Sequence, residues 1–487
     1  MSRYRKLTLL HSNDLHGDFL TEHIDDKLVG GISMLSGYVN QVREQEQNTL
    51  YVIAGDMFRG SIIDSEYCGV STIDLMNLLG PDVVAIGNHE ADYGLQHLLF
   101  LEKCASFPII NANLYIKLNH RRLFTPCYIA QVDGMKILFI GIITEAILAQ
   151  TRMDETVGSF VDINEAAVEV GRICNTYNAV DVDLTVLLTH IGHEEDKQLA
   201  AQLDPAWGVD VIIGGHSHTL LSEPERVNGI PIVQAGTGTD QIGRFDIVVD
   251  TARNTVHEFT WQTIPIDAGH CPRDREVEEL LGWYQQKTDA KYNRIVSRFA
   301  CELTHPDRYQ ETSLGNLAAD ILRECYAVDL MMVGSGSIRS KKLGPVVHYS
   351  DLTECFPYDD SVYMISVTGR QLEKMLRHVL REEAFQGDHT EFYQLSYGMC
   401  LHWSRRGQAF HKLTLDGEPL SEQRLYTVGL QKYHFMNLKE FLDVTLEEVE
   451  ANRKVRVLAT SYLDVVEEYI AAHQHLSRSV EGRIVIL

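Results

Sequence analysis

Five short polar clusters, rich in Asp, Asn and His, each follow an apolar, strand-like run. The clusters are Asp14-Leu15-His16 after LTLL, Gly55-Asp56 after LYVIA, Gly87-Asn88-His89-Glu90 after DVVAI, His190 after DLTVLLT, and Gly215-His216-Ser217-His218 after VDVIIG. A single DxH or HxH motif is common and carries little information. Five such turns at successive strand ends load one edge of a sheet with carboxylate, amide and imidazole groups, an arrangement that can bind a pair of metal ions.

The side chains in these clusters carry groups that bind divalent first-row metal ions. Asp14 and His16 are two residues apart, so we expect their side chains to point the same way if the strand continues through them. The two oxygens of Asp56 can bridge two ions. An amide oxygen and three imidazoles complete the set, namely Asn88, His190, His216 and His218. Seven ligands with one shared carboxylate suit two ions about 3.5–4 Å apart, and such a pair lowers the pKa of a bridging water to about 7, which supplies a hydroxide nucleophile.

Length and composition indicate a soluble globular protein of more than one domain. The chain has 487 residues, of which 45% are hydrophobic and 23% charged, and this length exceeds one ordinary core. The formal net charge of -25 and the absence of a long Lys/Arg run argue against a nucleic acid polymer as partner. Small anionic substrates are compatible with this charge, because bound cations and a few arginines can dominate the field inside a pocket.

The sequence predicts a cytoplasmic protein that does not enter the membrane. The first expected strand begins at about Lys6, which leaves no room for a signal peptide. The longest apolar stretches, such as 136–143, are far short of the roughly 20 residues that span a bilayer. The nine cysteines are scattered, odd in number and without a CxxC pair, a pattern typical of reduced and mostly buried thiols.

Strand-like and helix-like runs alternate through about residue 265, which predicts an α/β sheet flanked by helices. The expected strands before the polar clusters are 6–11, 50–54, 82–86, 183–189 and 209–213, and the expected helices include 31–45, 70–79, 94–104, 163–176 and 194–202. Open α/β sheets bind ligands at the carboxyl ends of their strands, which is where the clusters lie. A charged segment with helical spacing, from Cys271 to about Val296, is interpreted as a helix that connects two domains.

Taken together, these motifs resemble the calcineurin-like metallophosphoesterases, and more closely the 5'-nucleotidase family that includes ecto-5'-nucleotidase and bacterial UDP-sugar hydrolases. The resemblance rests on SNDLHG (12–17), AGD (54–56), GNHEADYG (87–94), THIG (189–192) and GGHSHTLL (214–221). It implies one metal bound by Asp14, His16, Asp56 and His218, and a second bound by Asp56, Asn88, His190 and His216.

The resemblance also implies a domain organisation for a cytoplasmic, bacterial-type member of this family. We expect a metallophosphoesterase domain at 1–270, built as a four-layer α/β/β/α sandwich. A connecting helix at 271–297 would follow it. A smaller α/β domain at 298–487, like the C-terminal domain of 5'-nucleotidases, would bind the substrate.

The motif GNHEADYG resembles the family's catalytic dyad, here His89 and Asp92. In this interpretation Asp92 fixes the tautomer of His89 and keeps it cationic, and His89 stabilises the phosphoryl charge or protonates the leaving oxygen. Ala91 stands where the family usually has Phe, a difference that we expect to affect packing more than chemistry. The structural alternative is a helix N-terminal cap with an incidental imidazole.

Fainter matches in the second half of the chain indicate a substrate site. Arg308 lies seven residues before Gly315, and Arg339 ends VGSGSIR (333–339), which resembles the family's NGGGIR loop. The resemblance implies that both arginines bind phosphate. Their structural alternative is an ordinary surface or inter-domain salt bridge.

Two tyrosines stand where the family has aromatic residues. Tyr358 lies in CFPYDD, and Tyr433 lies seven residues after Tyr426 in the YTVGLQKY strand. The resemblance implies that they stack on a nucleobase, although buried strand aromatics are a common alternative. The family's GGDG segment, whose aspartate contacts ribose, is absent, and the chain reads HFMNLKEF there. The resemblance therefore implies no ribose contact at this position.

Other polar residues receive structural interpretations. The glycine-rich segment AGTGTDQIGR (235–244) could cradle a phosphate, but its place between two strand-like runs favours a turn near the metal site. Several histidines outside the clusters are interpreted as surface or satisfied core residues. These are His11, His23, His193 and His348.

The sequence therefore predicts a metal-dependent phosphoric ester hydrolase with two divalent ions as cofactors. The leading substrate is a nucleoside 5'-monophosphate, and the alternatives are a UDP-sugar or other pyrophosphate and a 2',3'-cyclic nucleotide. Mn, Zn, Co, Fe and Ni all accept these ligands. A hypothesis from a different class is a non-catalytic nucleotide-binding protein with structural metals. His89 and Asp92 speak against it, because a structural site needs neither a dyad nor open coordination positions.

Overall fold

The computed structural model describes residues 3–24, 27–116, 119, 121–144, 159–160, 163–177, 180–385 and 391–487. The chain divides into two units, Met1–Thr288 and Asp289–Leu487. Within the described ranges, no helix combines the length and the apolar character needed to cross a bilayer.

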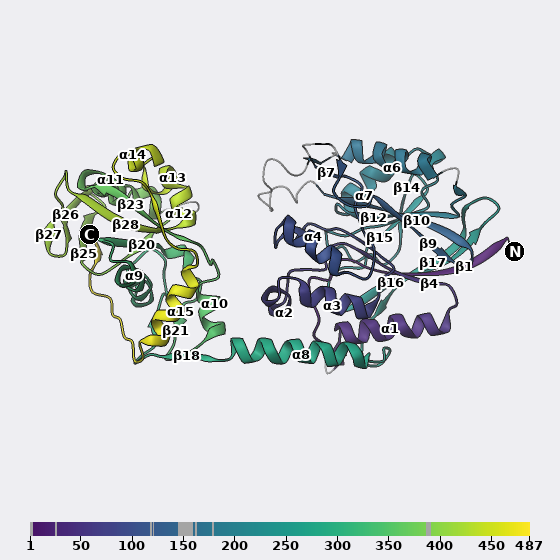
Figure 1. Ribbon diagram of the computed structural model, residues 1–487, viewed down its shortest axis with the longest axis horizontal. Helices are drawn as coiled ribbons and strands as arrows, with labels where there is room; N and C mark the ends of the chain where they lie inside the picture. The colour runs from purple at the N-terminus through teal and green to yellow at the C-terminus, as the bar shows by residue number, and fades with distance from the viewer. Residues whose placement is uncertain are drawn as a thin grey trace. The chain divides into compact units, whose positions relative to one another are not determined.

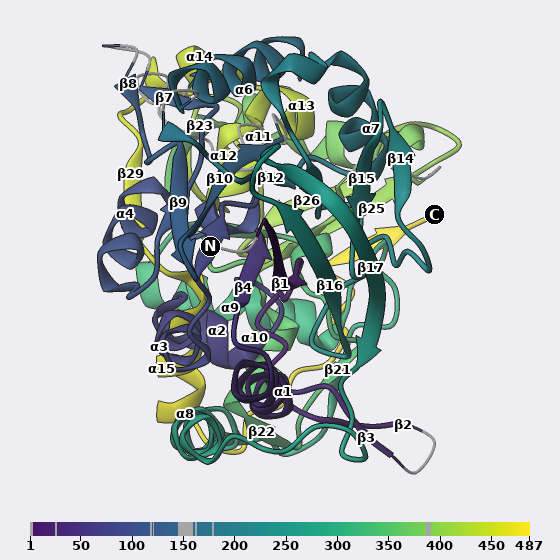
Figure 2. The same cartoon turned by 90° about the vertical axis from the view of Figure 1, so that its right-hand side faces the viewer.

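Two six-stranded sheets form the centre of the N-terminal unit. The first has the order β17 (Thr255–Pro265), β16 (Gln241–Asp250), β1 (Tyr4–Ser12), β4 (Thr49–Ala54), β5 (Val83–Ala85) and β6 (Ile109–Ile110). The second has the order β14 (Glu225–Val227), β15 (Ile230–Val233), β13 (Val211–Ile213), β12 (Leu184–His190), β10 (Met135–Ile143) and β9 (Cys127–Val132). Figure 2 shows β4, β1, β16 and β17 running side by side. Because β1, β4 and β5 pair in parallel, as do β12 and β13, the carboxyl ends within each set share one edge of their sheet.

The central strands of both sheets are buried on both faces, and alternate residues therefore enter different cores. In β1, Leu9 joins the apolar cluster between the sheets, where it meets residues of the second sheet such as Phe139. Its neighbour Leu10 faces the opposite side and packs among helix residues. In β10, the side chain of Leu138 likewise lies on the outer face of its sheet and packs among helix residues. The continuous apolar runs of the sequence are explained by this two-sided burial.

Helices cover the outer face of each sheet (Figure 1). The first sheet is covered by α1 (Ile32–Gln45), α3 (Val70–Leu79), α4 (Leu95–Cys104) and the first half of α8 (Arg275–Tyr292). The second sheet is covered by α6 (Ile163–Tyr177) and α7 (His193–Gln202). The predicted four-layer α/β/β/α arrangement is thereby confirmed.

The C-terminal unit is a smaller α/β fold around a five-stranded sheet. The sheet has the order β24 (Tyr393–Leu395), β20 (Leu330–Gly334), β28 (Leu425–Gln431), β23 (Val362–Thr368) and β29 (Arg456–Ala459). One face packs against α9 (Ser313–Tyr326), α10 (Tyr349–Cys355) and α15 (Tyr462–Ala472). The other face packs against α11 (Gly369–Val379), α13 (Leu438–Leu442) and a second sheet of β27 (Glu418–Pro419), β26 (Ala409–Leu415), β25 (Met399–Ser404) and β30 (Ile484–Ile486).

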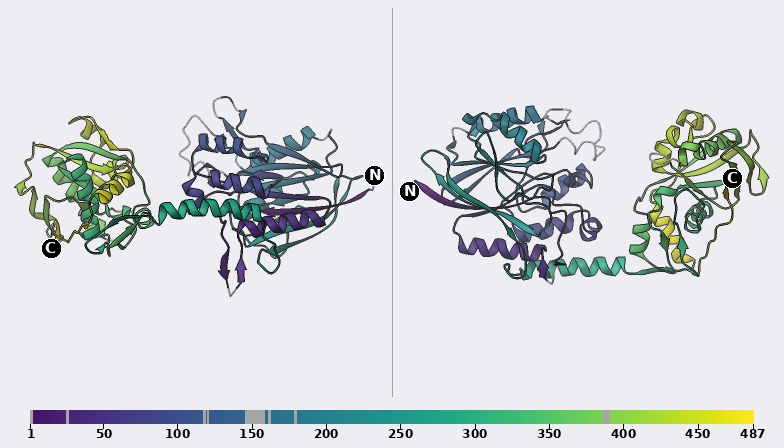
Figure 3. Two further views of the ribbon diagram at one scale, coloured as in Figure 1. Left: turned by 60° about the horizontal axis from the view of Figure 1, so that its bottom comes forward. Right: turned by 180° about the vertical axis from the view of Figure 1, so that it is seen from behind.

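Short elements complete the two units. The hairpin of β2 (Glu22–Ile24) and β3 (Lys27–Val29) extends away from the sandwich (Figure 3). The remaining short strands are β7 (Leu114–Ile116), β8 (Arg121–Arg122), β11 (Ser159–Phe160), β18 (Ile295–Arg298), β19 (Leu303–Thr304), β21 (Lys342–Leu343) and β22 (Val346–His348). The short helices are α2 (Ile62–Glu66), α12 (Lys432–Met436) and α14 (Leu446–Glu450). Each of these three helices has five residues, too few to show helical periodicity in the sequence.

The cysteines depart from the sequence expectation. All nine are free thiols, but only four are buried. Four are exposed, namely Cys68, Cys104, Cys301 and Cys325. Two of these lie on helices, at the end of α4 and on the outer side of α9. The expectation that most thiols are buried is wrong, because scattered cysteines fall on helix surfaces as well as in the cores.

His11, on β1, is a core residue of the N-terminal unit. Its side chain is fully buried between Trp261 and Phe245. The Trp261 Nε1–H donates to His11 Nε2 over 2.9 Å, and His11 Nδ1 has no partner among the described residues. The neutral ring must therefore carry its proton on Nδ1. Burial lowers the pKa of His11 to about 3.

We predict that His11 makes the N-terminal unit acid-sensitive. The pKa is lower in the folded state than in the unfolded one, so the unfolded state binds more protons and stability is lost as pH falls below about 6.5 toward 3. Relative to His11→Gln, which does not titrate, the wild type should lose about 2 kcal/mol of unfolding free energy between pH 7 and pH 5. Urea unfolding of the chelator-treated proteins at both pH values measures this difference. A constant difference between the two proteins at all pH values would contradict the prediction.

Candidate metal centre

The seven predicted ligands meet at the carboxyl ends of five strands. They follow β1 (Asp14, His16), β4 (Asp56), β5 (Asn88) and β13 (His216, His218), or end β12 (His190). Donor atoms of Asp14, His16 and His218 lie within 4.8 Å of one another, and so do those of Asp56, His190 and His216. Asn88 Oδ1 joins the second group, 2.7 Å from His216 Nδ1 and 3.2 Å from His190 Nε2.

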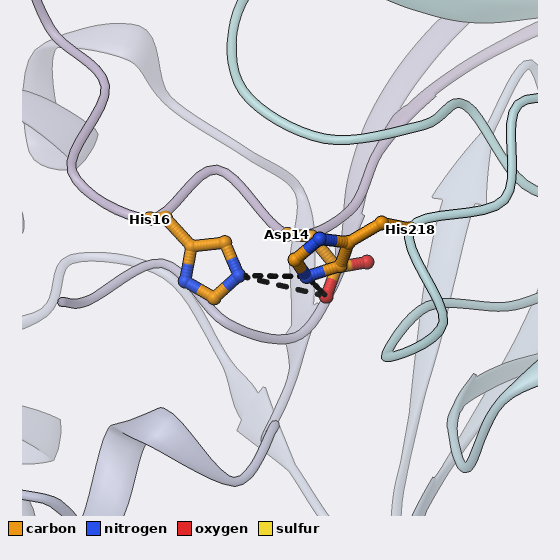
Figure 4. A group of neighbouring side chains, drawn as sticks. All are labelled: Asp14, His16 and His218. Atoms are coloured by element: carbon orange, nitrogen blue, oxygen red, sulfur yellow. Dashed lines mark hydrogen bonds and ion pairs between the residues drawn. The ribbon is translucent and has the colours of Figure 1, made fainter. Parts of the chain in front are cut away.

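The spacing of these atoms fits ligands around a common cation. Ligands about 2.1 Å from an ion lie about 3.0–3.4 Å apart in octahedral or tetrahedral geometry. His190 Nε2 is 3.0 Å from Asp56 Oδ2, and His218 Nε2 is 3.4 Å from Asp14 Oδ1. Figure 4 shows His16 and His218 pointing toward one another and toward the Asp14 carboxylate, with their Nε2 atoms 3.0 Å apart. Two neutral imidazole lone pairs at this distance repel each other unless a proton or a cation lies between them, so the donor set fits metal ions.

Hydrogen bonds orient two of the imidazoles so that Nε2 is left to bind a metal ion. His190 Nδ1 lies 2.8 Å from the Ala54 carbonyl oxygen, and His16 Nδ1 lies 3.3 Å from the Phe58 carbonyl oxygen. Carbonyl oxygens only accept, so Nδ1 carries the proton in both rings and Nε2 presents its lone pair. Within the buried Asp56–His190 pair each charged form stabilises the other, which lowers the pKa of Asp56 and raises that of His190 against the effect of burial.

Five of the seven ligand candidates adopt left-handed backbone conformations. Asp14, His16, Asp56, His216 and His218 have φ values between 50° and 79°. A non-glycine residue in this region costs of order 1–3 kcal/mol and persists only when the surroundings impose it. Because β1 ends at Ser12, the strand does not continue through Asp14 and His16, and the condition under which strand alternation would align their side chains is not met. Tight turns, rather than strand alternation, bring the two side chains together.

Two glycines allow these turns to approach closely. A Cβ on Gly87 would lie 2.2 Å from Asp56 Oδ1, and a Cβ on Gly55 would lie 2.5 Å from His190 Nδ1. Gly55 also has a φ of 84°. Any side chain at either position would displace a ligand, which explains why glycines stand beside ligands in these two clusters.

Glu90 is a buried supporting residue whose role the sequence did not reveal. Its carboxylate accepts backbone N–H groups from Asp56 at 3.0 Å, Met57 at 2.6 Å and Gly87 at 2.6 Å. Burial raises the pKa of Glu90 to about 7, and the charge of Asp56 adds to the shift. Glu90 therefore ties the turn that holds Asp56 to the turn that holds Asn88. Its position directly after His89 was the only signal for this role.

Further hydrogen bonds support Asp14 and the turn after β13. The His216 backbone N–H donates to Asp14 Oδ2 at 3.0 Å, and the Gly238 N–H donates to the Asp14 carbonyl oxygen at 2.9 Å. Residues 236–240 thus turn beside the ligand cluster, as predicted, whereas the rest of the predicted segment, 241–244, belongs to β16. Buried Asp196 accepts from the hydroxyl of Thr189 and from the amide of Gln234, and sequence reasoning did not find it.

His89 and Asp92 form a close pair at the edge of the ligand cluster. His89 Nδ1 lies 2.8 Å from Asp92 Oδ2, and the Arg59 Nε–H donates to the same oxygen at 3.0 Å. The bond to Asp92 raises the pKa of His89, whereas burial opposes the shift. The His89 backbone N–H donates to Asp56 Oδ1 at 2.8 Å. A ring nitrogen of His89 lies within 4.8 Å of donor atoms of His16 and Asp56, so the pair is positioned beside the ligands.

All four predicted substrate residues line one cavity of about 320 Å³ in the C-terminal unit. Its lining residues are Arg308, Gly336, Ser337, Arg339, Tyr358, Asp360, Glu391, Tyr433 and His434. Tyr358 and Tyr433 are 47% and 51% exposed, which excludes the interpretation of buried strand aromatics. Tyr433 lies on α12 and not on the preceding strand, because β28 ends at Gln431.

A carboxylate and a hydroxyl group orient the two arginines of this cavity. Arg308 Nη2 lies 3.2 Å from Glu391 Oε2, and the Gly336 N–H donates to Glu391 Oε1 at 2.8 Å. The Arg339 Nη2–H donates to the Tyr358 hydroxyl at 2.7 Å. Burial raises the pKa of Glu391. Glu391 orients Arg308 as well as the glycine-rich loop, and the sequence analysis did not identify it.

A larger cavity, of about 680 Å³, lies at the other end of the N-terminal unit's strands. It surrounds Asp210, directly before β13, and Thr255, which begins β17. The Asp210 carboxylate accepts hydrogen bonds from the Thr185 backbone N–H and the Thr255 hydroxyl. The volume of a cavity therefore does not identify the functional site in this protein, whereas the residue types of the ligand cluster do.

Comparisons with known proteins agree with this geometry. Residues 7–220 match the family described as calcineurin-like phosphoesterase, and residues 295–445 match the family described as 5'-nucleotidase, C-terminal domain. The 5'-nucleotidase of Mus musculus is 26% identical over 536 residues, which cover 98% of this chain and 90% of the mouse protein.

Two solved structures share the fold. The 5'-nucleotidase precursor from Thermus thermophilus has a TM-score of 0.59 and 22% identity, with 99% of each chain covered. The NAD nucleotidase of Haemophilus influenzae has a TM-score of 0.57 and 16% identity, and 100% of this chain and 99% of that chain are covered. With one matched family in each unit, the chain belongs to the 5'-nucleotidase family of calcineurin-like metallophosphoesterases.

Proposed function

We propose that this chain hydrolyses phosphate monoesters with two divalent cations, and that its main substrate is a nucleoside 5'-monophosphate, which it converts to nucleoside and phosphate. The mouse relative named 5'-nucleotidase, similar over almost its whole length, supports this substrate class. The metal-ligand geometry supports the reaction type. Mn, Zn, Co, Fe and Ni are all compatible with the mixed carboxylate, amide and imidazole ligands.

The observation that carries the proposal is the position of Asp56 between the two ligand groups. This carboxylate is 1% exposed, and its Oδ2 lies 3.0 Å from His190 Nε2 and 3.9 Å from His16 Nε2. A carboxylate placed in this way can serve two ions at once. When bound, such ions make water acidic enough to provide hydroxide near neutral pH and offset the charge of the phosphoryl group.

Protein side chains would orient the phosphoryl group and handle the proton. His89 Nδ1 is hydrogen-bonded to Asp92. Nε2 is therefore the ring nitrogen that can donate to a phosphoryl or leaving-group oxygen. Glu90 and the glycines of the turns hold the backbone of Asp56 and Asn88 in place. Rigid positioning of this kind keeps the reorganisation energy of the reaction low.

We assign recognition of the nucleoside to the cavity of the C-terminal unit. Its exposed rings, Tyr358 and Tyr433, offer stacking surfaces for a base. Arg308 and Arg339 offer guanidinium groups for a phosphate oxygen. Both arginines already have a hydrogen-bond partner on the cavity wall, which orients them before a substrate arrives.

Removal of metal should abolish turnover, and Asp56→Asn should impair binding of both ions. Mutation of a residue that only hydrogen-bonds to a metal ligand typically lowers activity or metal affinity by about 10–100-fold. Loss of a ligand shared by two ions should therefore lower activity by at least about 100-fold. Metal analysis of the dialysed proteins and phosphate release after reconstitution with each divalent ion measure these effects. Two equivalents of metal are expected in the wild type. Full activity in a chelator, or a single equivalent at full activity, would refute the two-ion proposal.

His89→Gln should lower kcat by about 10²–10⁴-fold, because the variant loses the proton donor of the dyad. Its metal content should equal that of the wild type. His270→Gln is the matched control, since His270 Nδ1 lies 2.7 Å from Asp267 Oδ1 in the same i,i+3 arrangement, with 64% of its side chain exposed. Steady-state kinetics of both variants test the assignment. Equal rates for His89→Gln and the wild type would show that His89 and Asp92 do not act as a catalytic pair.

Tyr433→Ala and Tyr358→Ala should each raise KM for a nucleoside monophosphate by about 5- to 150-fold, since stacking is worth about 1–3 kcal/mol per base. KM for ribose 5-phosphate, which has no base, should change little. Tyr397→Ala is the control, because Tyr397 is 39% exposed and also packs against an arginine, with Arg323 4.3 Å from its ring centroid. An equal rise in KM for both substrates would show that the tyrosines do not recognise a base.

A panel of nucleotides, UDP-sugars, cyclic nucleotides and sugar phosphates ranks the remaining possibilities. We expect the highest kcat/KM for a nucleoside 5'-monophosphate. A UDP-sugar or a 2',3'-cyclic nucleotide in first place would replace the substrate while leaving the metal chemistry intact.

A further inference from the structure

Arg59 connects to the catalytic pair through a shared oxygen. The Arg59 Nε–H donates to Asp92 Oδ2 at 3.0 Å, and His89 Nδ1 lies 2.8 Å from the same atom. Arg59 is three residues after Asp56, in the turn that follows β4. The three side chains therefore form a continuous hydrogen-bonded row that starts beside the metal ligands and ends at a guanidinium group.

The backbone of Arg59 is held in a conformation that arginine rarely adopts. Its φ is 70°, in the left-handed region, which persists only where neighbouring groups impose it. The Arg59 backbone N–H donates to Asp64 Oδ2 at 2.8 Å, and the Tyr93 hydroxyl donates to the same oxygen at 2.6 Å. Asp64 is fully buried. One buried carboxylate thus fastens the Arg59 turn to the turn that carries His89 and Asp92.

The guanidinium group is oriented but not saturated. Its carbon lies 5.6 Å from the centroid of the Tyr93 ring, a distance that allows a cation–π contact. Only Nε has a hydrogen-bond partner among the described residues. Four of the five N–H donors of the group are therefore available. The side chain is 49% exposed, so a ligand can reach these donors.

Arg59 also supplies positive charge beside a group of carboxylates. In the ion pairs of the described residues, no other Arg or Lys pairs with the Asp and His ligand candidates, with His89 or with Asp92. Carboxylates surround the site, from Asp14, Asp56, Glu90 and Asp92. An exposed Arg–Asp pair contributes little to stability by itself. A guanidinium beside a site that must receive a phosphate dianion can bind it through two N–H groups at once.

We propose that Arg59 is a phosphate-binding residue of this metal centre: its Nε positions Asp92, and its Nη groups bind an oxygen of the phosphoryl group. This assignment rests on the proposed phosphomonoesterase function. It concerns a residue outside the metal ligands, the His89–Asp92 pair and the cavity of the C-terminal unit. The ligand class is a phosphate monoester or its product, inorganic phosphate.

The test uses the full-length, metal-loaded protein and two readouts. Isothermal titration with inorganic phosphate measures binding without turnover, and steady-state kinetics with a nucleoside 5'-monophosphate measures kcat and KM. Arg59→Ala should weaken phosphate binding by at least about tenfold and lower kcat/KM by about 100-fold, as for loss of one donor to a developing negative charge. Arg59→Lys keeps the charge but loses the fork of N–H donors, so it should recover part of both losses.

Arg43→Ala is the matched control. Arg43 Nη2 is 3.0 Å from Asp82 Oδ2, the same distance as in the Arg59 pair, but Asp82 precedes β5, whereas the metal ligands follow the strands. Its phosphate affinity and kcat/KM should match the wild type. A loss in Arg43→Ala as large as that in Arg59→Ala would show a general effect of charge and overturn the assignment.

A second background separates positioning from direct contact. In Asp92→Ala, which removes the partner of Nε, Arg59→Ala should still weaken phosphate binding by at least about tenfold. Disappearance of the effect in that background would show that Arg59 acts only through Asp92 and would overturn the proposal. Unchanged phosphate binding in Arg59→Ala alone would do the same. Failure of the wild type to hydrolyse any phosphoester would instead reject the proposed function, and the titration would still report on Arg59.

Discussion

The buried carboxylate of Asp56 is the constraint around which the N-terminal unit is organised. An unpaired buried charge is expensive, so its neighbours must supply donors or cations. The His89 backbone N–H approaches Oδ1, and His190 approaches Oδ2. Asp56 and these two partners come from the ends of three different strands, β4, β5 and β12, so the charge is compensated only when both sheets are assembled. The cost of burying Asp56 therefore couples the metal site to the four-layer fold.

That coupling also explains the strained backbone of the ligands. A strand delivers its side chains to the faces of the sheet, whereas metal ligands must point past its end. The chain resolves this conflict by turning sharply after β1, β4 and β13, with ligand residues at positive φ. Glycines such as Gly55 and Gly87 let the turns approach, and Glu90 connects the turn after β4 to the turn after β5 through backbone N–H groups. Binding of cations would favour the same turns, so the strain and the ligand set belong to one function.

Apolar periodicity and residue type are local properties, so the sequence predicted an α/β sheet flanked by helices, the order of the strand-end clusters and the seven ligand candidates. The four-layer arrangement was an expectation from the family resemblance. It did not predict the backbone of the ligand turns, since left-handed conformations at Asp and His are imposed by distant contacts. The roles of Glu90 and Glu391 were missed for a related reason, because their carboxylates bind backbone N–H groups that the sequence does not display. Tyr433 was placed on a strand because the five-residue helix α12 is too short to produce a periodic pattern.

In the proposed function, the N-terminal unit compensates the charge of the phosphate and the C-terminal unit recognises the shape of the nucleoside. The chain has a net charge of -25 and would repel a phosphate dianion unless local cations reversed the field. In the C-terminal cavity the two arginines share the lining with Asp360 and Glu391, so the formal charges of the four side chains balance. The proposed recognition of a nucleoside there would depend on stacking and on the direction of hydrogen bonds. In the N-terminal unit the carboxylates outnumber the fixed cations, and bound metal ions together with Arg59 would have to supply the attraction. In the proposed function the rings of the C-terminal cavity select the nucleoside, whereas the metal centre and Arg59 act on the phosphoryl group, so substitution of the rings should change the preferred nucleoside without altering the chemistry at phosphorus.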